Sequence, residues 1–310
     1  MHDHDLGLGH DLRVMSRRRM LGALGIAGVA AAAACATDSP GTTSSTSATP
    51  STLPAAAPGE TAGPYPGDGS NGPNVLIESG VVRSDITGSF GAYSGTAQGV
   101  PMTLTLNLVD LTTNAVGTGM AVYVWHCDRE GRYSLYSEGV TDQNYLRGVQ
   151  VADDSGTVTF TSIFPACYTG RWPHIHFEVY DSLSIAVAGD NARLTSQIAL
   201  PQDACETVFA ADSGYTASTR NMSGVTLSSD NVFGDGWDAE LATVTGTPAT
   251  AMAVSLTVGV ADKSQNTQSD SGFPGGQPPG GQGGQPPAGQ DGQPPAGPGG
   301  EPPSGGRPSR

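Results

Sequence analysis

Positive charge is scarce in this sequence of 310 residues. Lys263 is the only lysine, and 14 basic side chains stand against 29 acidic ones, which gives a formal net charge of −15. Proteins that bind duplex nucleic acid contact the phosphates mainly through lysine and arginine. The composition therefore argues against nucleic acid as a partner, and an acidic surface also disfavours anionic lipid.

Long apolar runs are missing as well. The run Leu21–Ala34 is the best candidate, and a membrane-spanning helix needs about 20 mainly apolar residues. A protein with several membrane spans is thereby excluded. The irregular spacing of the glycines excludes a collagen in the same way.

Glycine and proline are abundant, but they are concentrated at one end. Residues 271–310 contain 14 of the 44 glycines and 11 of the 23 prolines, with Phe273 as the only aromatic residue. Such a segment cannot bury enough apolar surface to offset the entropy of ordering it. We therefore expect 263–310 to be a disordered tail rich in Gly, Pro and Gln.

The N-terminal residues have the pattern of an export signal. Arg17, Arg18 and Arg19 precede the apolar run, which resembles a twin-arginine signal; the alternative is a chance basic patch before an Ala-rich helix. The sequence Ala32-Ala33-Ala34-Cys35 resembles a lipoprotein processing site, and cleavage without lipidation of Cys35 stays open. We expect residues 1–35 to direct export by the twin-arginine pathway to the cell surface or the medium, with a lipid anchor as one outcome.

Residues 36–58 form a Ser/Thr/Pro-rich linker, so the folded domain is expected at 59–262. Its apolar residues alternate with polar ones as in half-buried strands, and helical periodicity is limited to a short stretch at 203–210. Several short strands separated by glycine-rich turns predict an all-β sandwich of mostly antiparallel strands with long loops. The expected strands are 102–108, 123–125, 146–151, 158–161, 174–179 and 252–260.

Histidine is rare beyond the signal, where only His126, His174 and His176 remain. His174 and His176 are two residues apart, so on a strand both side chains point to the same face. Two imidazoles that project together from a strand suit a transition metal. The simpler interpretation of a bare His-x-His is two surface histidines on a polar face.

The blocks around this pair favour the metal. Together and in this order they resemble the intradiol ring-cleavage dioxygenases, in particular the exported group related to the protocatechuate 3,4-dioxygenase β chain. The similarity covers most of 59–210. The blocks that carry it are Glu60-Thr61-Ala62-Gly63-Pro64-Tyr65, Trp125-His126-Cys127-Asp128-Arg129-Glu130-Gly131-Arg132-Tyr133-Ser134, Leu146-Arg147-Gly148-Val149-Gln150 and Phe164–Val179.

The resemblance implies a non-haem ferric ion held by two tyrosinates and two histidines, which by position are Tyr133, Tyr168, His174 and His176. Phenolate oxygen is a hard anionic donor that favours ferric over ferrous iron. The implied reaction is cleavage of a catechol ring by O₂ to a muconate-type diacid, and the implied partners are therefore a small catecholic substrate and O₂.

Three further positions match the family. Arg171 corresponds to its active-site arginine and would stabilise the electron-rich ring of the substrate. Gln197 resembles its active-site glutamine, although the spacing from His176 is longer than in the compact enzymes. Tyr65 would border the substrate or serve as a packing aromatic. His126 has no counterpart among the ligands and is expected to be structural.

The cysteines leave two alternatives open. An exported protein can keep a disulfide, and Cys167–Cys205 is the preferred pair among Cys127, Cys167 and Cys205. A zinc site formed by Cys127, Cys167, His174 and His176 is the competing interpretation, but the Cys-x-x-Cys spacing of structural zinc sites is missing.

Two functions from different classes follow. The first is an exported intradiol dioxygenase, and the second is a non-catalytic β-sandwich binding module with a structural or vestigial metal site. Neither the identity of the catechol nor the oligomeric state is determined by the sequence, and a homo-oligomer is compatible with it.

Overall fold

Residues 53–189 and 191–265 are described by the structure, a computed structural model. The predicted signal and Cys35, most of the linker and nearly all of the tail lie outside these residues. Of the tail, only Lys263–Gln265 is included, as the short 3₁₀ turn η5. Among the described residues, no helix is long and apolar enough to cross a membrane.

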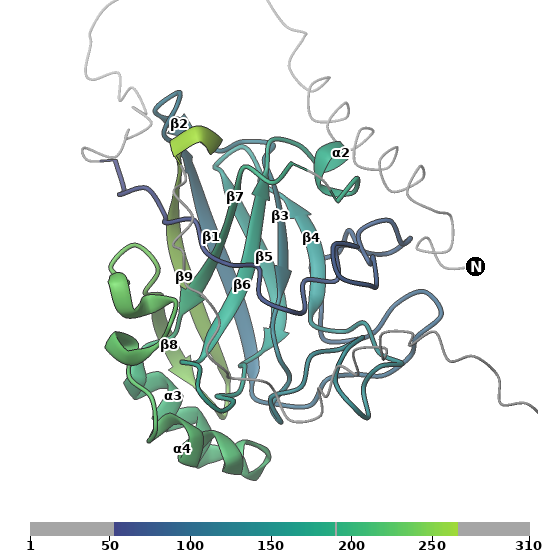
Figure 1. Cartoon of the computed structure of the whole chain (residues 1–310), viewed down its shortest axis with the longest axis vertical. Coiled ribbons are helices and arrows are strands. Elements are labelled where there is room, and N and C mark those ends of the chain that lie inside the picture. Colours follow the sequence, from purple (N-terminus) through teal and green to yellow (C-terminus); the bar gives the residue numbers. More distant parts are fainter. Residues whose placement is uncertain (1–52, 190, 266–310) are drawn as a thin grey trace, which may run out of the picture.

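Two sheets packed face to face confirm the predicted β-sandwich (Figure 1). The first sheet has the order β2-β1-β9-β8, with β5 paired to the other edge of β1, and the second has the order β4-β3-β6-β7. All pairings are antiparallel except that of β1 with β9. The strands are β1 Pro101–Asp110, β2 Ala115–Val116, β3 Ala121–Trp125, β4 Arg147–Val151, β5 Thr157–Ile163, β6 His174–Tyr180, β7 Leu194–Ala199, β8 Thr243–Thr247 and β9 Ala251–Val260.

Alternation of side chains places the core between the sheets. In β1 every second residue from Met102 to Leu108 is buried, as its sequence pattern predicts. In β6 the apolar set contributes Ile175 and Phe177 to the same core cluster. Each expected strand falls on an observed strand, and only Leu146, which precedes β4, lies outside.

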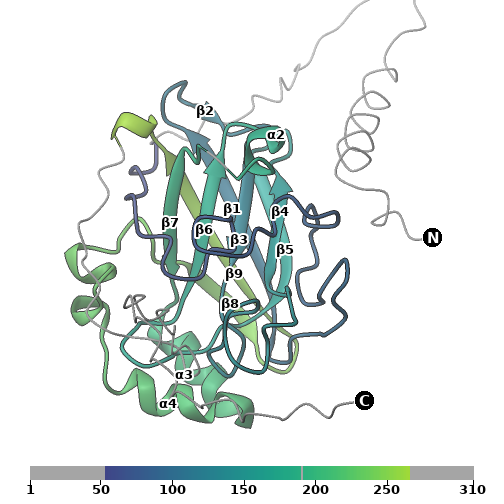
Figure 2. The ribbon, with the colours of Figure 1, turned by 45° about the vertical axis from the view of Figure 1, so that its right-hand side comes forward.

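In the described part of the chain the helices are few: α3 and α4 lie together at one end of the sandwich, and the short α2 lies at the other end (Figures 1 and 2). The predicted helix at 203–210 is confirmed as α3, Gln202–Ala211. The sequence did not predict β7 or the helix that follows α3. The remaining elements are α2 Leu183–Ala186, α4 Thr216–Met222, and the 3₁₀ turns η2 Ser213–Tyr215, η3 Leu227–Ser229 and η4 Phe233–Asp235.

The outer face of the β4-β3-β6-β7 sheet is covered and not exposed. All seven residues of β6 are buried, including His174, His176 and Glu178. The first described segment, purple in Figures 1 and 2, runs across β7 and β6, and its backbone accepts a hydrogen bond at Thr61 from Gln197 of β7 (2.9 Å). The alternative of two surface histidines is therefore wrong, because this segment closes over them.

Candidate metal centre

Two histidines and two tyrosines from three parts of the chain meet beneath this cover. His174 and His176 lie on β6, Tyr168 lies in the loop before β6, and Tyr133 lies in the long loop between β3 and β4. The Nε2 atom of His174 is 3.2 Å from Nε2 of His176, 3.2 Å from the Tyr168 hydroxyl and 3.4 Å from the Tyr133 hydroxyl. The four predicted ligands thus present four donor atoms to one another.

The orientation of His174 is set by its other ring nitrogen. Nδ1 lies 2.5 Å from the carbonyl oxygen of Trp172. A carbonyl can only accept, so Nδ1 carries the proton and the lone pair of Nε2 points into the cluster. A backbone carbonyl that fixes the tautomer of an imidazole in this way is a common arrangement around metal-binding histidines.

His176 is oriented by packing. Its imidazole stacks on the indole of Trp125, with the ring centroids 5.0 Å apart and an angle of 6° between the planes. Its Nδ1 is buried and has no hydrogen-bond partner within the described part of the chain. Polar interaction of this ring therefore depends on Nε2, which faces the cluster.

Burial controls the protonation of all four side chains. It lowers the pKa of His174 and that of His176 well below the usual histidine value, so both rings are neutral and carry a free lone pair. Burial also raises the pKa of Tyr133 well above its ordinary value and that of Tyr168 to about 12. Without a cation both phenols stay protonated, so a bound metal has to displace two phenolic protons.

Glycine allows the covering segment to approach closely. Gly63 has φ +71°, and a Cβ added there would lie 3.2 Å from Cε1 of His176. A residue with a side chain would be strained in this left-handed conformation and would press on the imidazole. Gly131, with φ +85°, lies against Tyr168 in the same manner.

The donor set fits ferric iron. Once they lose their protons, the two phenol oxygens are hard anionic donors, and together with two neutral imidazoles they suit a trivalent iron. Among the described residues no group of three or more His, Cys, Asp and Glu side chains could hold a metal ion. Since half of the donors here are phenols, this cluster is of another kind, and the Cys/His zinc alternative has no site.

Arg171 and Gln197 lie together beside the ligands. The Nη2 group of Arg171 donates to Oε1 of Gln197 over 2.7 Å. Gln197 is directly opposite His176 in the pairing of β6 with β7, so its side chain lies on the same face as the histidine. The longer sequence spacing is thus accommodated by a strand that pairs in register with β6.

Tyr65 faces two other tyrosines. Its ring centroid lies 5.2 Å from that of Tyr133 and 5.0 Å from that of Tyr136. Such tilted aromatic pairs are typical of packed clusters. The half-buried Tyr65 is therefore part of an aromatic wall next to a predicted ligand, and Tyr136 is a member of that wall which the sequence did not predict.

Arg147 fixes the loop that carries Tyr133. It is 1% exposed and donates to both the hydroxyl (3.0 Å) and the carbonyl (3.0 Å) of Ser134, the residue after Tyr133. It also donates to the carbonyl of Pro66 (2.8 Å), the residue after Tyr65. One guanidinium thereby joins the loop to the covering segment.

A buried acid, Asp230, completes the surroundings of Arg171. Its carboxylate accepts from Nε of Arg171 over 3.0 Å, and it follows Arg171 by 59 residues in the chain. Asp230 comes after η3 in an irregular stretch with no pattern that predicts a role. Only the folded chain reveals the pair.

The predicted disulfide is wrong. Cys127, Cys167 and Cys205 are all buried free thiols. The Sγ of Cys167 instead lies 3.4 Å from the carbonyl of Arg171, and that of Cys205 lies 3.9 Å from the carbonyl of Leu200. The thiols fill space beside the loop before β6, and burial raises the pKa of Cys167 to about 12.

His126 is structural, as expected. Its ring nitrogens lie 2.8 Å from the carbonyl of Cys127 and 2.8 Å from the hydroxyl of Ser162. Both polar atoms of the ring are satisfied away from the cluster.

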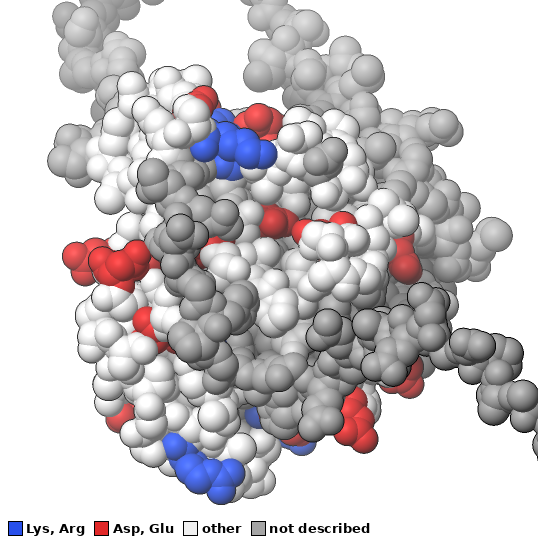
Figure 3. All heavy atoms as spheres, viewed as in Figure 1, with Lys and Arg blue, Asp and Glu red and all other residues white. Residues whose placement is uncertain are grey.

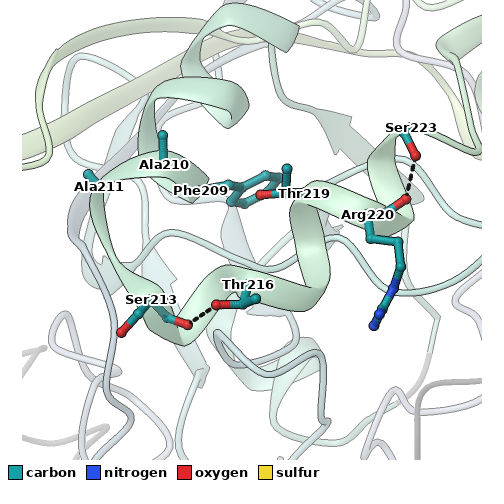
Figure 4. A pocket seen from close by; sticks show the side chains of 8 residues that line it. All are labelled: Phe209, Ala210, Ala211, Ser213, Thr216, Thr219, Arg220 and Ser223. Carbon is teal, nitrogen blue, oxygen red and sulfur yellow. Dashed lines mark hydrogen bonds between the residues drawn. The ribbon is translucent and has the colours of Figure 1, made fainter.

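Two hollows lie elsewhere, at the helical end. The hollow in Figure 4 is lined by residues of α3, η2 and α4 and by Ser223. The hydroxyls of Thr216 and Ser223 already donate to backbone carbonyls there. The second hollow, which Trp172 and Met222 help to line, contains none of the four ligands. On the face seen in Figure 3, charged side chains are sparse and scattered.

Comparison with known proteins places the chain in a known group. A family model described as "Dioxygenase" matches residues 77–231. Chlorocatechol 1,2-dioxygenase of Rhodococcus opacus is 41% identical over 51 residues, which is 16% of this chain and 20% of that protein. The alignment therefore spans about a fifth of the length of this curated relative.

Solved structures have the same fold. The intradiol ring-cleavage dioxygenase of Tetranychus urticae aligns with a TM-score of 0.52 and 24% identity over 70% of this chain and 98% of its own. A second dioxygenase crystal structure aligns with a TM-score of 0.54 and 24% identity, covering 71% of this chain and 98% of its own.

Proposed function

Because the chain belongs to the intradiol ring-cleavage dioxygenase family, we propose that it uses non-haem Fe(III) to cleave the ring of a catechol with O₂. The bond that breaks joins the two hydroxylated carbons, both oxygen atoms enter the product, and a muconate-type diacid results. The observation that carries the proposal is the convergence of Tyr133, Tyr168 and His176 on Nε2 of His174.

Four side chains would hold the metal, namely Tyr133, Tyr168, His174 and His176. When bound there, ferric iron supplies a Lewis acid that draws electron density from a coordinated catecholate and so makes its ring reactive toward O₂. The neutral histidines give their Nε2 lone pairs, and the two phenols release their protons on binding.

Tyr168 has a second role in this proposal. Burial raises the pKa of its hydroxyl to about 12, so the free phenol keeps a proton at neutral pH. An incoming catechol has two hydroxyl protons to lose, and the Tyr168 oxygen can accept one of them. This residue therefore acts as ligand and proton acceptor in turn.

Arg171 supplies fixed positive charge. Its side chain is 7% exposed, and a charge in a site that excludes water interacts more strongly with developing negative charge than it would in bulk solvent. It would stabilise the electron-rich ring of the bound substrate. Tyr65 and Tyr136 would pack against that ring as aromatic neighbours.

Export by the twin-arginine pathway, with or without a lipid on Cys35, belongs to the same proposal. This pathway carries folded proteins, so iron would be loaded before export. Cell fractionation of the full chain and of an Arg17→Lys/Arg18→Lys/Arg19→Lys variant tests it, and retention of only the variant in the cytoplasm is expected.

The test of function is oxygen uptake by iron-loaded protein. Purified protein is loaded with Fe(III), iron is counted, and O₂ consumption is followed with catechol, protocatechuate and hydroxyquinol. We expect about one iron per chain, a red-brown colour from tyrosinate-to-iron charge transfer, and a product heavier than the substrate by one O₂. Protein that binds no iron and consumes no O₂ with any catechol would instead be a non-catalytic binding module.

A further inference from the structure

The guanidinium of Arg171 is held on two sides. Asp230 accepts from Nε at 3.0 Å through Oδ2 and from Nη2 at 3.4 Å through Oδ1. Gln197 accepts from the same Nη2 group at 2.7 Å. Forked pairing of this kind fixes both the position and the plane of a guanidinium.

The carboxylate that holds it is itself fixed. Asp230 is 2% exposed, and its Oδ2 accepts from the backbone N–H of Trp172 at 2.7 Å. Its Oδ1 accepts from the N–H groups of Val232 at 2.9 Å and Phe233 at 3.2 Å. Three backbone donors leave the carboxylate no freedom to follow a moving arginine.

The remaining amino group of Arg171 is uncommitted. Nε and Nη2 are used by Asp230 and Gln197, whereas Nη1 makes no hydrogen bond to any described residue and is not a buried unsatisfied atom. One edge of the guanidinium, with Nε and Nη2, is thus held by the protein, and the Nη1 group is left to donate to a ligand. Gln197 extends the connection to the carbonyl of Thr61 at 2.9 Å, in the segment that covers the histidines.

We propose that Asp230 is the positioning residue of this site: it aims Nη1 of Arg171 at the substrate ring and, through Gln197, ties the arginine to the covering segment. The inference rests on the proposed function. A carboxylate also compensates a buried cation whose desolvation would otherwise be costly. Without it the guanidinium would rotate toward solvent, and its charge would no longer face the ring.

The experiment compares Asp230→Asn with Asp110→Asn in the iron-loaded full chain. Asp110 pairs with Nη2 of Arg193 at 2.5 Å, and its side chain is 15% exposed, so it controls for the loss of an Arg–Asp pair away from the metal. We expect D230N to lower kcat on the order of 100-fold, as misplacement of a catalytic group does. KM, iron content and the resting absorption band should stay close to those of the wild type, and D110N should leave kcat unchanged.

A double-mutant cycle establishes whether Asp230 acts through the arginine. If it does, Arg171→Ala/Asp230→Asn is no slower than Arg171→Ala alone. A further loss of the same size as in D230N alone would overturn the inference, as would a D230N variant with the kcat of D110N.

If D230N does not fold, Asp230→Glu replaces it, because it keeps the charge but shifts it by one methylene. The proposal expects an intermediate kcat with normal iron content, and a wild-type kcat would overturn it.

A second readout is independent of turnover. In iron-free protein, the melting temperatures of Arg171→Met, D230N and the double variant give the coupling of the pair. We expect the double variant to lose much less melting temperature than the two single variants lose when their losses are added. Additive losses would overturn the pairing. If the wild-type protein binds iron but consumes no O₂ with any catechol, the proposed function is wrong. If the wild type is active and D230N has the same kcat, only this inference is wrong.

Discussion

The indole of Trp125 lies parallel to the imidazole of His176 at a centroid distance of 5.0 Å, and the two residues are directly paired between β3 and β6. No other interaction on the described chain fixes this ring through Nδ1, which lacks a hydrogen-bond partner. On this side of the ring, the orientation of a predicted iron ligand is therefore set by ring stacking and not by a hydrogen bond.

Trp125→Leu is expected to weaken iron binding by about 10- to 100-fold, which is typical when the partner of a metal ligand is removed. The cavity left by the indole should also lower the free energy of unfolding by about 2 to 5 kcal/mol. Trp125→Phe keeps an aromatic face against His176 and serves as the control. Chelator competition measures the affinity, and equal affinity in both variants would contradict the role of the stack.

Tyr133→Phe and Tyr168→Phe should each change the colour of the iron-loaded protein, because each removes one phenolate donor to the metal. We expect the visible band of the wild type to be lost or strongly displaced in both. Tyr180→Phe is the matched control on β6, since the Tyr180 hydroxyl donates to Glu178 at 2.6 Å. If Tyr180→Phe loses the visible band as fully as the two variants, the band does not depend specifically on Tyr133 and Tyr168.

Gly63→Ala should damage the metal centre more than the fold. A left-handed alanine costs about 1 to 2 kcal/mol, and here its Cβ would also lie 3.2 Å from the His176 ring. Gly91→Ala has a similar φ of +65°, with only the flexible Glu78 side chain within reach at 3.6 Å. Urea denaturation should give similar losses for both, and iron titration should show weaker binding for Gly63→Ala alone.

Stability should fall as the pH is lowered through the titration of His126. Burial lowers the pKa of this ring from 6.5 to about 4, so between these values the unfolded chain holds a proton that the folded state does not. The free energy of unfolding therefore declines from pH 6.5 toward pH 4, by about 3 kcal/mol for such a shift.

His126→Gln removes the titrating group, so its unfolding free energy should depend less steeply on pH over this range. Urea denaturation of iron-free protein at several pH values measures the slope. Parallel curves for the variant and the wild type would assign the acid sensitivity to other groups.

Glu240→Gln should stabilise the protein in alkaline solution. Burial, reinforced by the neighbouring Glu60, raises the pKa of the Glu240 carboxyl to about 9. The folded state then keeps a proton that the unfolded chain releases near 4.5, so stability falls as the pH rises between these values. A glutamine resembles the protonated acid and has no proton to lose.

We expect the melting temperature of Glu240→Gln to exceed that of the wild type at pH 8 and to approach it at pH 5. The exposed Glu206→Gln on α3 is the control. A variant that melts with the same pH dependence as the wild type would contradict the assignment.

Local patterns in the sequence were enough to predict the sandwich and the residues that meet in the cluster. Alternation predicted β1, β5 and β9 because one face of each is buried, and the quoted blocks predicted Tyr133, Tyr168 and the histidines. Asp230 was beyond such an argument because its partner lies 59 residues away and nothing local marks it. The disulfide failed for a related reason: distance along the chain does not tell how far apart two thiols lie in space.

The covering segment also follows no period, since glycine and proline set its course. Its contacts with Gln197 and Arg147 exist only once β4 and β7 are paired. The sequence was enough to predict the residues of the site, but not that the covering segment would bury the face of β6 on which the histidines lie.

The covering segment also has a consequence for the order in which the domain folds. The segment that carries Gly63 leaves the ribosome before any of the four ligands, yet it can dock only after β3, β6 and β7 have formed the surface beneath it. We therefore expect the centre to be enclosed late in folding, by the part of the domain that is synthesised first. We therefore expect firm iron retention only in chains whose segment around Gly63 has docked over the histidines, so that iron retention would report the completion of this last step.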